Sequence, residues 1–433
     1  MASFSIPEEL TDDLFEHLLD HVDRAGLKNA SMVNKRFKSQ ALPLLQKMYQ
    51  NILEDTRKLY SEICEYLIRE APLPDNERIL NNFEYFHTFG IHANSASHLE
   101  HARQIIVLIG NFCISELCLL KTLDLSFFKM ENSEEFSNIL ARVVTENRTI
   151  QRIKIDITSI GDFGAILIGD ALEKNKVLTN LSLGNNFIGD EGATKIAEAL
   201  SGNAVLTSLH LQNNSIGNAG AAAIAVALSE NAVLTEMHLT GNSIQEAGAS
   251  SIAGALHGNA NLQTLDLQDN EIRDTGAESL ASALRENWTL TNLNIGRNFI
   301  TAKGAKEIGE ALKVNTTLQS LGVCGNNIGA EGAAEIARGL HDNEAITDLD
   351  LYRNDIGDDG AVAIAEALKK NGSLTGLDLT LNGIGYKGAQ SIASALSANR
   401  ILKRINLIRN NMGDEGKLLI AKASESEDIA YMV

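Results

Sequence analysis

The sequence has only four prolines and four cysteines in 433 residues, and it has neither a basic surplus nor a long apolar run. Its net charge of −19 argues against nucleic-acid binding, which needs a concentrated positive field, and against binding to an anionic membrane surface. No stretch approaches the length of a membrane span. Cys113 and Cys118 have neither zinc-type nor thioredoxin-type spacing, so free thiols in a reducing compartment are expected. Because the start of the chain lacks a basic region and an apolar run, no secretory signal is predicted, and we expect a cytoplasmic protein.

One asparagine returns at a constant interval of twenty-eight positions, without an insertion or a deletion. A fixed period of this length indicates a solenoid of stacked repeats. Each asparagine lies in the frame L-x-x-L-x-L-x-x-N-x-I, which predicts a short strand with one buried face. Its amide is expected to bond to backbone groups that the following turn leaves unpaired, and to neighbouring copies. The asparagines are Asn186, Asn214, Asn242, Asn270, Asn298, Asn326, Asn354, Asn382 and Asn410.

The second half of each unit changes to helical spacing, with glycine and alanine where helices must lie close together, as in residues 220–228. A second series of asparagines ends each predicted helix, and asparagine tolerates the left-handed conformation that commonly closes a helix. Each unit is therefore predicted to be strand, turn, helix and turn. The second series is Asn203, Asn231, Asn259, Asn287, Asn315, Asn343, Asn371 and Asn399.

The frame resembles the ribonuclease-inhibitor class of leucine-rich repeats, which also occurs in NOD-like receptors and in the GTPase-activating protein for Ran. The resemblance covers residues 118–423 and implies an α/β horseshoe solenoid with a parallel inner sheet and outer helices, preceded by a small all-α domain. The first two repeats are irregular: Thr158 replaces the asparagine in one, and Phe128 replaces it in the other, shifted by two residues. Terminal repeats are usually atypical. Residues 424–433 are predicted to be an acidic C-terminal tail.

The N-terminal region differs in character, since Pro74 is the last proline of the chain and the other three precede it. Residues 1–45 resemble an F-box, whose pattern opens with Leu-Pro-x-Glu-Leu and ends with Leu-x5-Val-x3-Trp. About four additional residues near Asp20, and Phe37 in place of tryptophan, depart from that pattern. Residues 46–117 are predicted to be a helical linker and N-terminal cap. The F-box-like positions are Ile6, Pro7, Glu9, Leu10, Leu14, Leu18, Leu27, Val33 and Phe37.

F-box proteins with leucine-rich repeats are substrate receptors of cullin-type ubiquitin ligases. The resemblance therefore implies that the N-terminus binds a Skp1-type adaptor while the horseshoe holds a target protein. Two alternatives remain. The N-terminal helices could serve only as a cap for a leucine-rich-repeat binding protein outside the ubiquitin system, because solenoids need caps. The chain could also regulate an enzyme, as the Ran-type GTPase activators do, although their long acidic tail is absent here.

Near-identical repeats beneath an F-box-like segment are typical of eukaryotic proteins and of effectors that intracellular bacteria deliver. The C-terminus is acidic at Glu425, Glu427 and Asp428 and apolar from Ile429 to Val433. This order resembles the translocation signals of Legionella-type secreted leucine-rich-repeat effectors. The favoured interpretation is an effector that acts in the host cytosol.

Because the strand register never slips, equivalent positions are expected to form columns across the inner face, about 5 Å apart. Tyrosine and arginine, which are typical of interface hot spots, gather in the C-terminal half beside carboxylates that would suit a basic partner. The alternative is a solvated polar surface with internal arginine–aspartate pairs. The predicted partner-binding face comprises Arg297, Asp348, Asp350, Tyr352, Arg353, Asp378, Leu381, Ile408 and Arg409.

His210, His238 and Asp266 occupy neighbouring rungs of one column. Two imidazoles and a carboxylate are plausible ligands for zinc or iron, but no second shell is evident, and an exposed polar ladder is the favoured interpretation. Nothing resembles a nucleophile with its base, a phosphate loop or a pair of catalytic carboxylates. We therefore predict a monomeric binding protein that is not an enzyme, with no catalytic residue, no cofactor and no metal.

Overall fold

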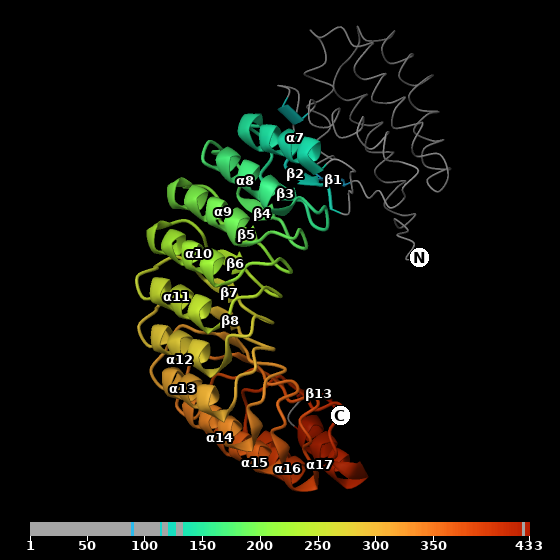
Figure 1. The fold of residues 1–433 in the computed structure, drawn as a ribbon. Helices are drawn as coiled ribbons and strands as arrows, with labels where there is room; N and C mark the ends of the chain where they lie inside the picture. Colours follow the sequence, from blue (N-terminus) through green and yellow to red (C-terminus); the bar gives the residue numbers. More distant parts are fainter. Residues whose placement is uncertain (1–87, 91–112, 115–119, 127–132, 427–428) are drawn as a thin grey trace, which may run out of the picture.

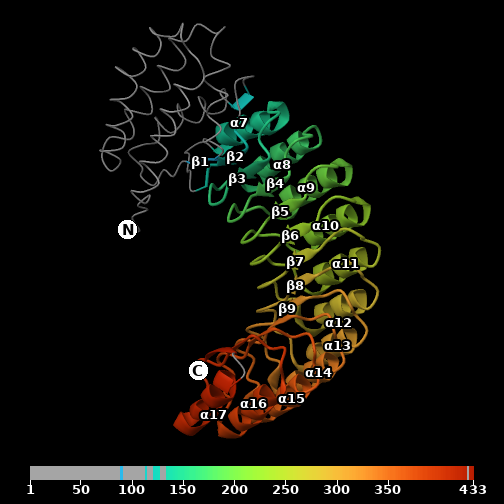
Figure 2. The same cartoon turned by 180° about the vertical axis from the view of Figure 1, so that it is seen from behind.

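The computed structural model describes residues 88–90, 113–114, 120–126, 133–426 and 429–433. One parallel sheet lines the inner face of a curved solenoid and helices cover its outer face (Figure 1), as the view from behind also shows (Figure 2). This arrangement confirms the predicted horseshoe. Thirteen strands follow one another in sequence order: β1 Thr88–Gly90, β2 Thr122–Asp124, β3 Arg152–Lys154, β4 Asn180–Ser182, β5 Ser208–His210, β6 Glu236–His238, β7 Thr264–Asp266, β8 Asn292–Asn294, β9 Ser320–Gly322, β10 Asp348–Asp350, β11 Gly376–Asp378, β12 Arg404–Asn406 and β13 Ala430–Met432.

A helix follows each strand from the second to the twelfth. The helices are α7 Ser133–Glu146, α8 Gly161–Leu172, α9 Asp190–Gly202, α10 Asn218–Glu230, α11 Glu246–Leu256, α12 Arg273–Leu284, α13 Ala302–Leu312, α14 Gly329–Leu340, α15 Gly357–Leu368, α16 Tyr386–Ala398 and α17 Gly413–Ser426. Among the described residues, no helix is long and apolar enough to cross a membrane. The F-box-like residues Ile6, Pro7, Glu9, Leu10, Leu14, Leu18, Leu27, Val33 and Phe37 lie outside the described residues.

The register of the sheet produces the predicted columns. Ser208 pairs with Glu236, and His210 pairs with His238, while the central Leu209 is fully buried between them. Successive side chains of a strand point to opposite faces, so the first and third residues of every strand lie on the concave face. Equivalent positions of successive repeats therefore stand side by side across the inner surface from β3 to β12.

The first asparagine series forms a buried ladder between repeats. Asn298 Nδ2 donates to the carbonyl oxygens of Leu267 and Gly296, at 2.9 Å in each case. Its Oδ1 accepts from the backbone N–H groups of Asn270, at 2.9 Å, and Ile272, at 3.3 Å. One side chain therefore satisfies turn backbone in its own repeat and in the preceding repeat, as the sequence predicts. Because these backbone groups are buried, the ladder stabilises both the turn and the stacking.

The second asparagine series does not adopt the left-handed backbone that the sequence predicted. Asn231 closes α10 with φ −80° and ψ 123°, which is extended, and no member of the series has a positive φ. Asn231 Nδ2 instead donates to Leu200 O of the preceding repeat at 2.7 Å. Its Oδ1 accepts from the N–H groups of Val233 and Leu234 at 2.8 and 2.7 Å. The asparagine is thus used for its side-chain hydrogen bonds rather than for a left-handed backbone.

Several helices are capped by a side chain of the preceding repeat. Asp190, in the first turn of α9, accepts hydrogen bonds from the N–H groups of Gly217 and Gly220 at the start of α10, at 2.7 and 2.8 Å. A carboxylate is favourable there because the first N–H groups of a helix have no partner within the helix. A Cβ on Gly220 would lie 2.8 Å from that carboxylate oxygen and 3.1 Å from Ala193 Cβ, so the close approach requires glycine.

Both ends of the sheet extend beyond the predicted repeats. The segment Thr88–Gly90, expected to lie in the helical cap, forms β1 and pairs with β2. Residues 424–433, expected to be an acidic tail, contain the end of α17 and then β13, which pairs with β12, with Ile429 only 5% exposed. The apolar residues that follow the acidic cluster therefore extend the sheet and its core. The shift of the first repeat is confirmed, since Leu123 pairs with Ile153, two positions beyond the partner that the constant interval would give.

Candidate functional site

The predicted partner-binding residues, here named the C-terminal concave patch, lie on or directly after strands β8 and β10 to β12 on the inner face. The patch consists of Arg297, Asp348, Asp350, Tyr352, Arg353, Asp378, Leu381, Ile408 and Arg409. Tyr352, Leu381 and Ile408 are half-buried, while Arg353 and Arg409 are exposed. Arg297 leans over Gly325 of the next repeat, where its Cγ lies 3.0 Å from the place that a Cβ would take.

Large side chains of the patch occupy a backbone position that is unusual for them. Arg297, Arg353, Leu381 and Arg409 have φ values of 53°, 53°, 54° and 58°. This left-handed conformation costs about 1–2 kcal/mol for most residues, and glycine, asparagine and aspartate tolerate it best. Four earlier repeats follow that preference, since the same column holds Asn185, Asn213, Gly241 and Asp269, all with positive φ, whereas Ile157 in the repeat before them does not.

Asp348 is paired within the chain. Its Oδ1 accepts a hydrogen bond from Arg404 Nη2, two rungs along the sheet. The pair crosses β11 above Gly376, where a Cβ would lie 2.4 Å from the Asp348 oxygen and 2.7 Å from the Arg404 nitrogen. Sequence reasoning missed Arg404 because the pair spans 56 residues, and the glycine between the two partners is the only signal that could have indicated it.

Asp350 and Asp378 are also engaged. Asp350 Oδ1 accepts from Tyr352 N at 2.9 Å, and Asp378 Oδ2 accepts from Asn406 Nδ2 at 2.9 Å. Burial, aided by the neighbouring charge of Asp378, raises the pKa of Asp350. Burial and Asp350 together raise the pKa of the Cys324 thiol to about 12. Each of the three carboxylates therefore already accepts a hydrogen bond from another residue of the chain. This agrees with the alternative interpretation, a polar surface with internal pairs.

Two of the three exposed arginines of the patch lie close together after β10 and β12, where the carboxylates described above are paired. Among the described residues, neither Arg353 nor Arg409 forms an ion pair. Arg353, Leu381 and Arg409 occupy the same column on successive rungs, since β10 pairs with β11 and β11 pairs with β12. The patch thus presents guanidinium groups beside an apolar side chain.

A second group of polar side chains lies on β5 to β7, here named the histidine cluster: Ser208, His210, Glu236, His238 and Asp266. The rings of His210 and His238 stack with centroids 4.3 Å apart and an interplanar angle of 9°. Glu236 Oε1 lies 2.8 Å from His238 Nε2, and Ser208 Oγ donates to Glu236 Oε2 at 2.7 Å. Ser208 Oγ also lies 3.0 Å from His210 Nε2. The sequence indicated the two histidines but missed Glu236 and Ser208, which precede them by two positions on the same strand face.

The two histidines differ in electrostatic environment. Burial and the adjacent His238 lower the pKa of His210. The Asp266 carboxylate raises the pKa of His238 against the effect of burial, and Glu236 raises it further. Burial opposes ionisation of Glu236, but hydrogen bonds from His238 and Ser208 lower its pKa on balance. The cluster therefore combines an imidazole that favours its neutral form with a carboxylate that favours its charged form.

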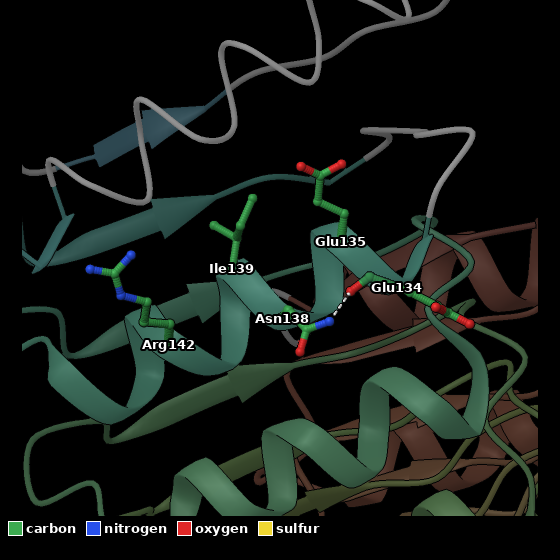
Figure 3. A pocket seen from close by; sticks show the side chains of 5 residues that line it. All are labelled: Glu134, Glu135, Asn138, Ile139 and Arg142. Atoms are coloured by element: carbon green, nitrogen blue, oxygen red, sulfur yellow. Dashed lines mark hydrogen bonds between the residues drawn. The ribbon is translucent and has the colours of Figure 1, made fainter.

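Among the described residues, a pocket beside α7 is lined by side chains of that helix (Figure 3). Its lining residues are Glu134, Glu135, Asn138, Ile139 and Arg142. Asn138 Nδ2 donates to Glu134 O at 2.8 Å, and Arg142 pairs with Glu146 at 3.2 Å.

The repeats, the continuous sheet and the exposed columns define a leucine-rich-repeat solenoid. A family model described as Leucine Rich repeat matches residues 174–197, 202–225, 230–253, 258–281, 314–337, 342–365 and 370–393. The intervening repeat keeps the fold, since it contains β8 and α13. Leucine-rich repeats provide scaffolds for protein–protein interaction.

Two solved structures are similar to this chain. One is the Leiomodin-1 Actin-Binding Site 2, with 21% identity, a TM-score of 0.31 and coverage of 35% of this chain and 88% of that chain. The other is the tropomodulin C-terminal domain from Caenorhabditis elegans, with 14% identity, a TM-score of 0.30 and coverage of 41% of this chain and 92% of that chain. No curated protein matches the chain.

Proposed function

We propose that this chain is an adaptor that holds a target protein on the C-terminal concave patch and recruits a Skp1-type component of a ubiquitin ligase through its F-box-like N-terminus. The proposal keeps the division into residues 1–45, 46–117 and the repeats, and it locates the chain in a eukaryotic cytosol, as a bacterial effector in a host cell. On this proposal the chain binds proteins and performs no catalysis itself.

The left-handed backbone under large side chains is the observation that carries the target-binding part. A left-handed Leu381 costs stability that asparagine, which occupies the same position as Asn213 in an earlier repeat, is expected to recover. Such strain concentrates at functional sites, where the side chain serves another purpose. Arg353 and Arg409 carry the same strain on the rungs beside Leu381, so three large side chains stand next to one another at a position that every repeat from residue 157 onward holds in the left-handed conformation.

The chemistry of the patch suits an acidic target surface. Arg353 and Arg409 are exposed without ion pairs among the described residues, while Asp348 is already paired with Arg404. Arginine forms bidentate hydrogen bonds with carboxylates, and tyrosine contributes a large contact area at low entropic cost. We therefore expect the target to place carboxylates around an apolar side chain that contacts Tyr352 and Leu381.

The target-binding part is tested with a double variant, Tyr352→Ala with Arg353→Asn. Gln268→Ala with Asp269→Asn is the matched control, because Gln268 and Asp269 lie in the same two columns three repeats earlier. Affinity purification from eukaryotic cells should lose the target with the first pair and retain it with the second. Equal recovery of the same proteins by both variants would remove the patch from the proposal.

The adaptor part rests on the F-box-like pattern at residues 6–37, which lies outside the described residues. Direct binding of a purified Skp1-type adaptor to the full chain provides the test. Replacement of Pro7 and Leu10 by alanine should reduce that binding at least tenfold, since Leu10 contributes to the apolar stripe of the first predicted helix. Absence of binding by the unmodified chain would favour the alternative in which the N-terminal helices only cap the solenoid.

A further inference from the structure

We propose that His210, Glu236 and His238 form a binding site for a divalent transition-metal ion, with zinc as the best match. Each residue offers one ligand atom, and these atoms all lie within 4.8 Å of one another. Imidazole nitrogens with one carboxylate oxygen are a typical ligand set for zinc. The site is separate from the C-terminal concave patch, because it lies on β5 and β6.

The sheet holds the three ligands in place. His210 and His238 are direct partners in the parallel register, so their side chains leave neighbouring rungs at the same height. Glu236 lies two positions before His238 on the same face of β6. Zinc bonds of about 2.1 Å place ligand atoms about 3.4 Å apart in tetrahedral geometry, so the two imidazoles, which stack at an interplanar angle of 9°, must turn out of that stack to direct their nitrogens to one ion.

The ligand atoms already face one another. Glu236 Oε1 lies 2.8 Å from His238 Nε2, and the hydroxyl of Ser208 fixes the second carboxylate oxygen at 2.7 Å. That hydroxyl also lies 3.0 Å from His210 Nε2, so it connects His210 to the carboxylate that His238 contacts. Ser208 is only 2% exposed, which gives the carboxylate a rigid support.

Asp266 lies near His238 and, once it moves to hydrogen-bond distance, would give the ring the outer support that a metal site requires. Its Oδ2 lies 3.8 Å from Nδ1 of His238, on the side of the ring opposite to Glu236, and its Oδ1 accepts from Gln268 N at 3.0 Å. Metal-bound histidines commonly direct their second nitrogen to a carboxylate, which orients the ring and fixes its tautomer. The sequence alone suggested Asp266 as a ligand, but the structure places it behind His238 and gives the ligand position to Glu236.

Three protein ligands leave the fourth position of a tetrahedral ion open. This position faces the concave surface, so water or a histidine, cysteine or carboxylate of a bound partner can complete the site. The competing explanation is an ordinary ladder of hydrogen-bonded polar groups with no affinity for metal. A metal titration separates the two explanations.

The experiment uses the full chain without a histidine tag, freed of metal by chelation and titrated with Co²⁺, followed by displacement with Zn²⁺. Glu236→Gln is the decisive variant, because it keeps all ten histidines and changes one ligand. His238→Asn removes a second ligand. His257→Asn is the matched control, since His257 lies 4.0 Å from Glu286 but belongs to no such three-ligand group among the described residues. Circular dichroism confirms that each variant folds.

The unmodified chain is expected to show the visible absorption of tetrahedral Co²⁺. At the same concentration of free zinc, it should bind one more zinc ion per chain than Glu236→Gln. Glu236→Gln and His238→Asn should weaken binding by about 100-fold or more, and Asp266→Asn by about 10-fold to 100-fold. His257→Asn should bind as the unmodified chain does. Identical stoichiometry and affinity in the unmodified chain and Glu236→Gln would overturn the proposal.

Discussion

Replacement of Asn298 by alanine should destabilise the solenoid more than the same replacement of Asn270. Both side chains are fully buried, so the deleted volume and its surroundings are closely matched. They differ in the number of backbone N–H groups that depend on them. Asn298 Oδ1 accepts from two, those of Asn270 and Ile272, whereas Asn270 Oδ1 accepts only from Ile244 N at 3.2 Å.

The magnitude follows from this count. Each carbonyl oxygen that accepts from the side chain of Asn270 or Asn298 also has a second hydrogen-bond donor. Leu267 O, for example, accepts from both side chains, so it keeps one hydrogen bond when either asparagine is replaced. Each buried N–H group without a partner costs about 1–3 kcal/mol. Asn298→Ala is therefore expected to cost about 2–6 kcal/mol and Asn270→Ala about 1–3 kcal/mol.

Native-state hydrogen exchange is the appropriate assay, because a solenoid can open locally rather than in one global step. The amides of residues 270 and 272 should lose protection in Asn298→Ala, and that of Ile244 in Asn270→Ala. Denaturant unfolding gives the total change in free energy. Equal destabilisation by the two variants, or a loss below about 1 kcal/mol for Asn298→Ala, would refute the hydrogen-bond account of the ladder.

Further predictions concern the concave face. Leu381→Asn should raise the free energy of unfolding by about 1 kcal/mol by relieving the left-handed backbone, and a lower denaturant midpoint would contradict this. Asp350→Asn should stabilise the protein at pH 7. The pKa of Asp350 is raised in the folded protein, so its ionised carboxylate opposes folding. The stabilisation should shrink as the pH falls, because protonation of Asp350 removes the same penalty. Alkylation of Cys324 by iodoacetamide at pH 8, followed by peptide mass spectrometry, should be far slower than in the unfolded chain because its pKa is raised to about 12, and equal rates would exclude the buried thiol.

The strict repeat period explains why much of this architecture could be predicted from the sequence. The unbroken spacing between Asn186 and Asn410 fixes the register, and the register then places Tyr352, Leu381 and Ile408 on neighbouring rungs. The terminal strands had no comparable signal. The segments Thr88–Gly90 and Ala430–Met432 join the sheet through backbone hydrogen bonds that any sequence can form, and neither contains the leucine frame.

The details of the sites were less predictable because they depend on side-chain direction. Arg404 reaches Asp348 only because Gly376 has no side chain. The left-handed backbone at Arg353 is hidden in the sequence, since arginine gives no local indication of it. Glu236 is found next to His238 only once both are known to leave the same face of one strand. The repeat period therefore predicts where each side chain leaves the backbone, whereas its contacts depend on the packing of the residues around it.

The central claim is that one chain links an adaptor at its N-terminus to a target on its C-terminal concave patch. Quantitative affinity purification from eukaryotic cells, with the unmodified chain, the Pro7/Leu10 alanine variant and the Tyr352→Ala/Arg353→Asn variant, tests it most directly. The account predicts that the first variant loses the Skp1-type adaptor and keeps the target, while the second loses the target and keeps the adaptor. Retention of both proteins by both variants would contradict it.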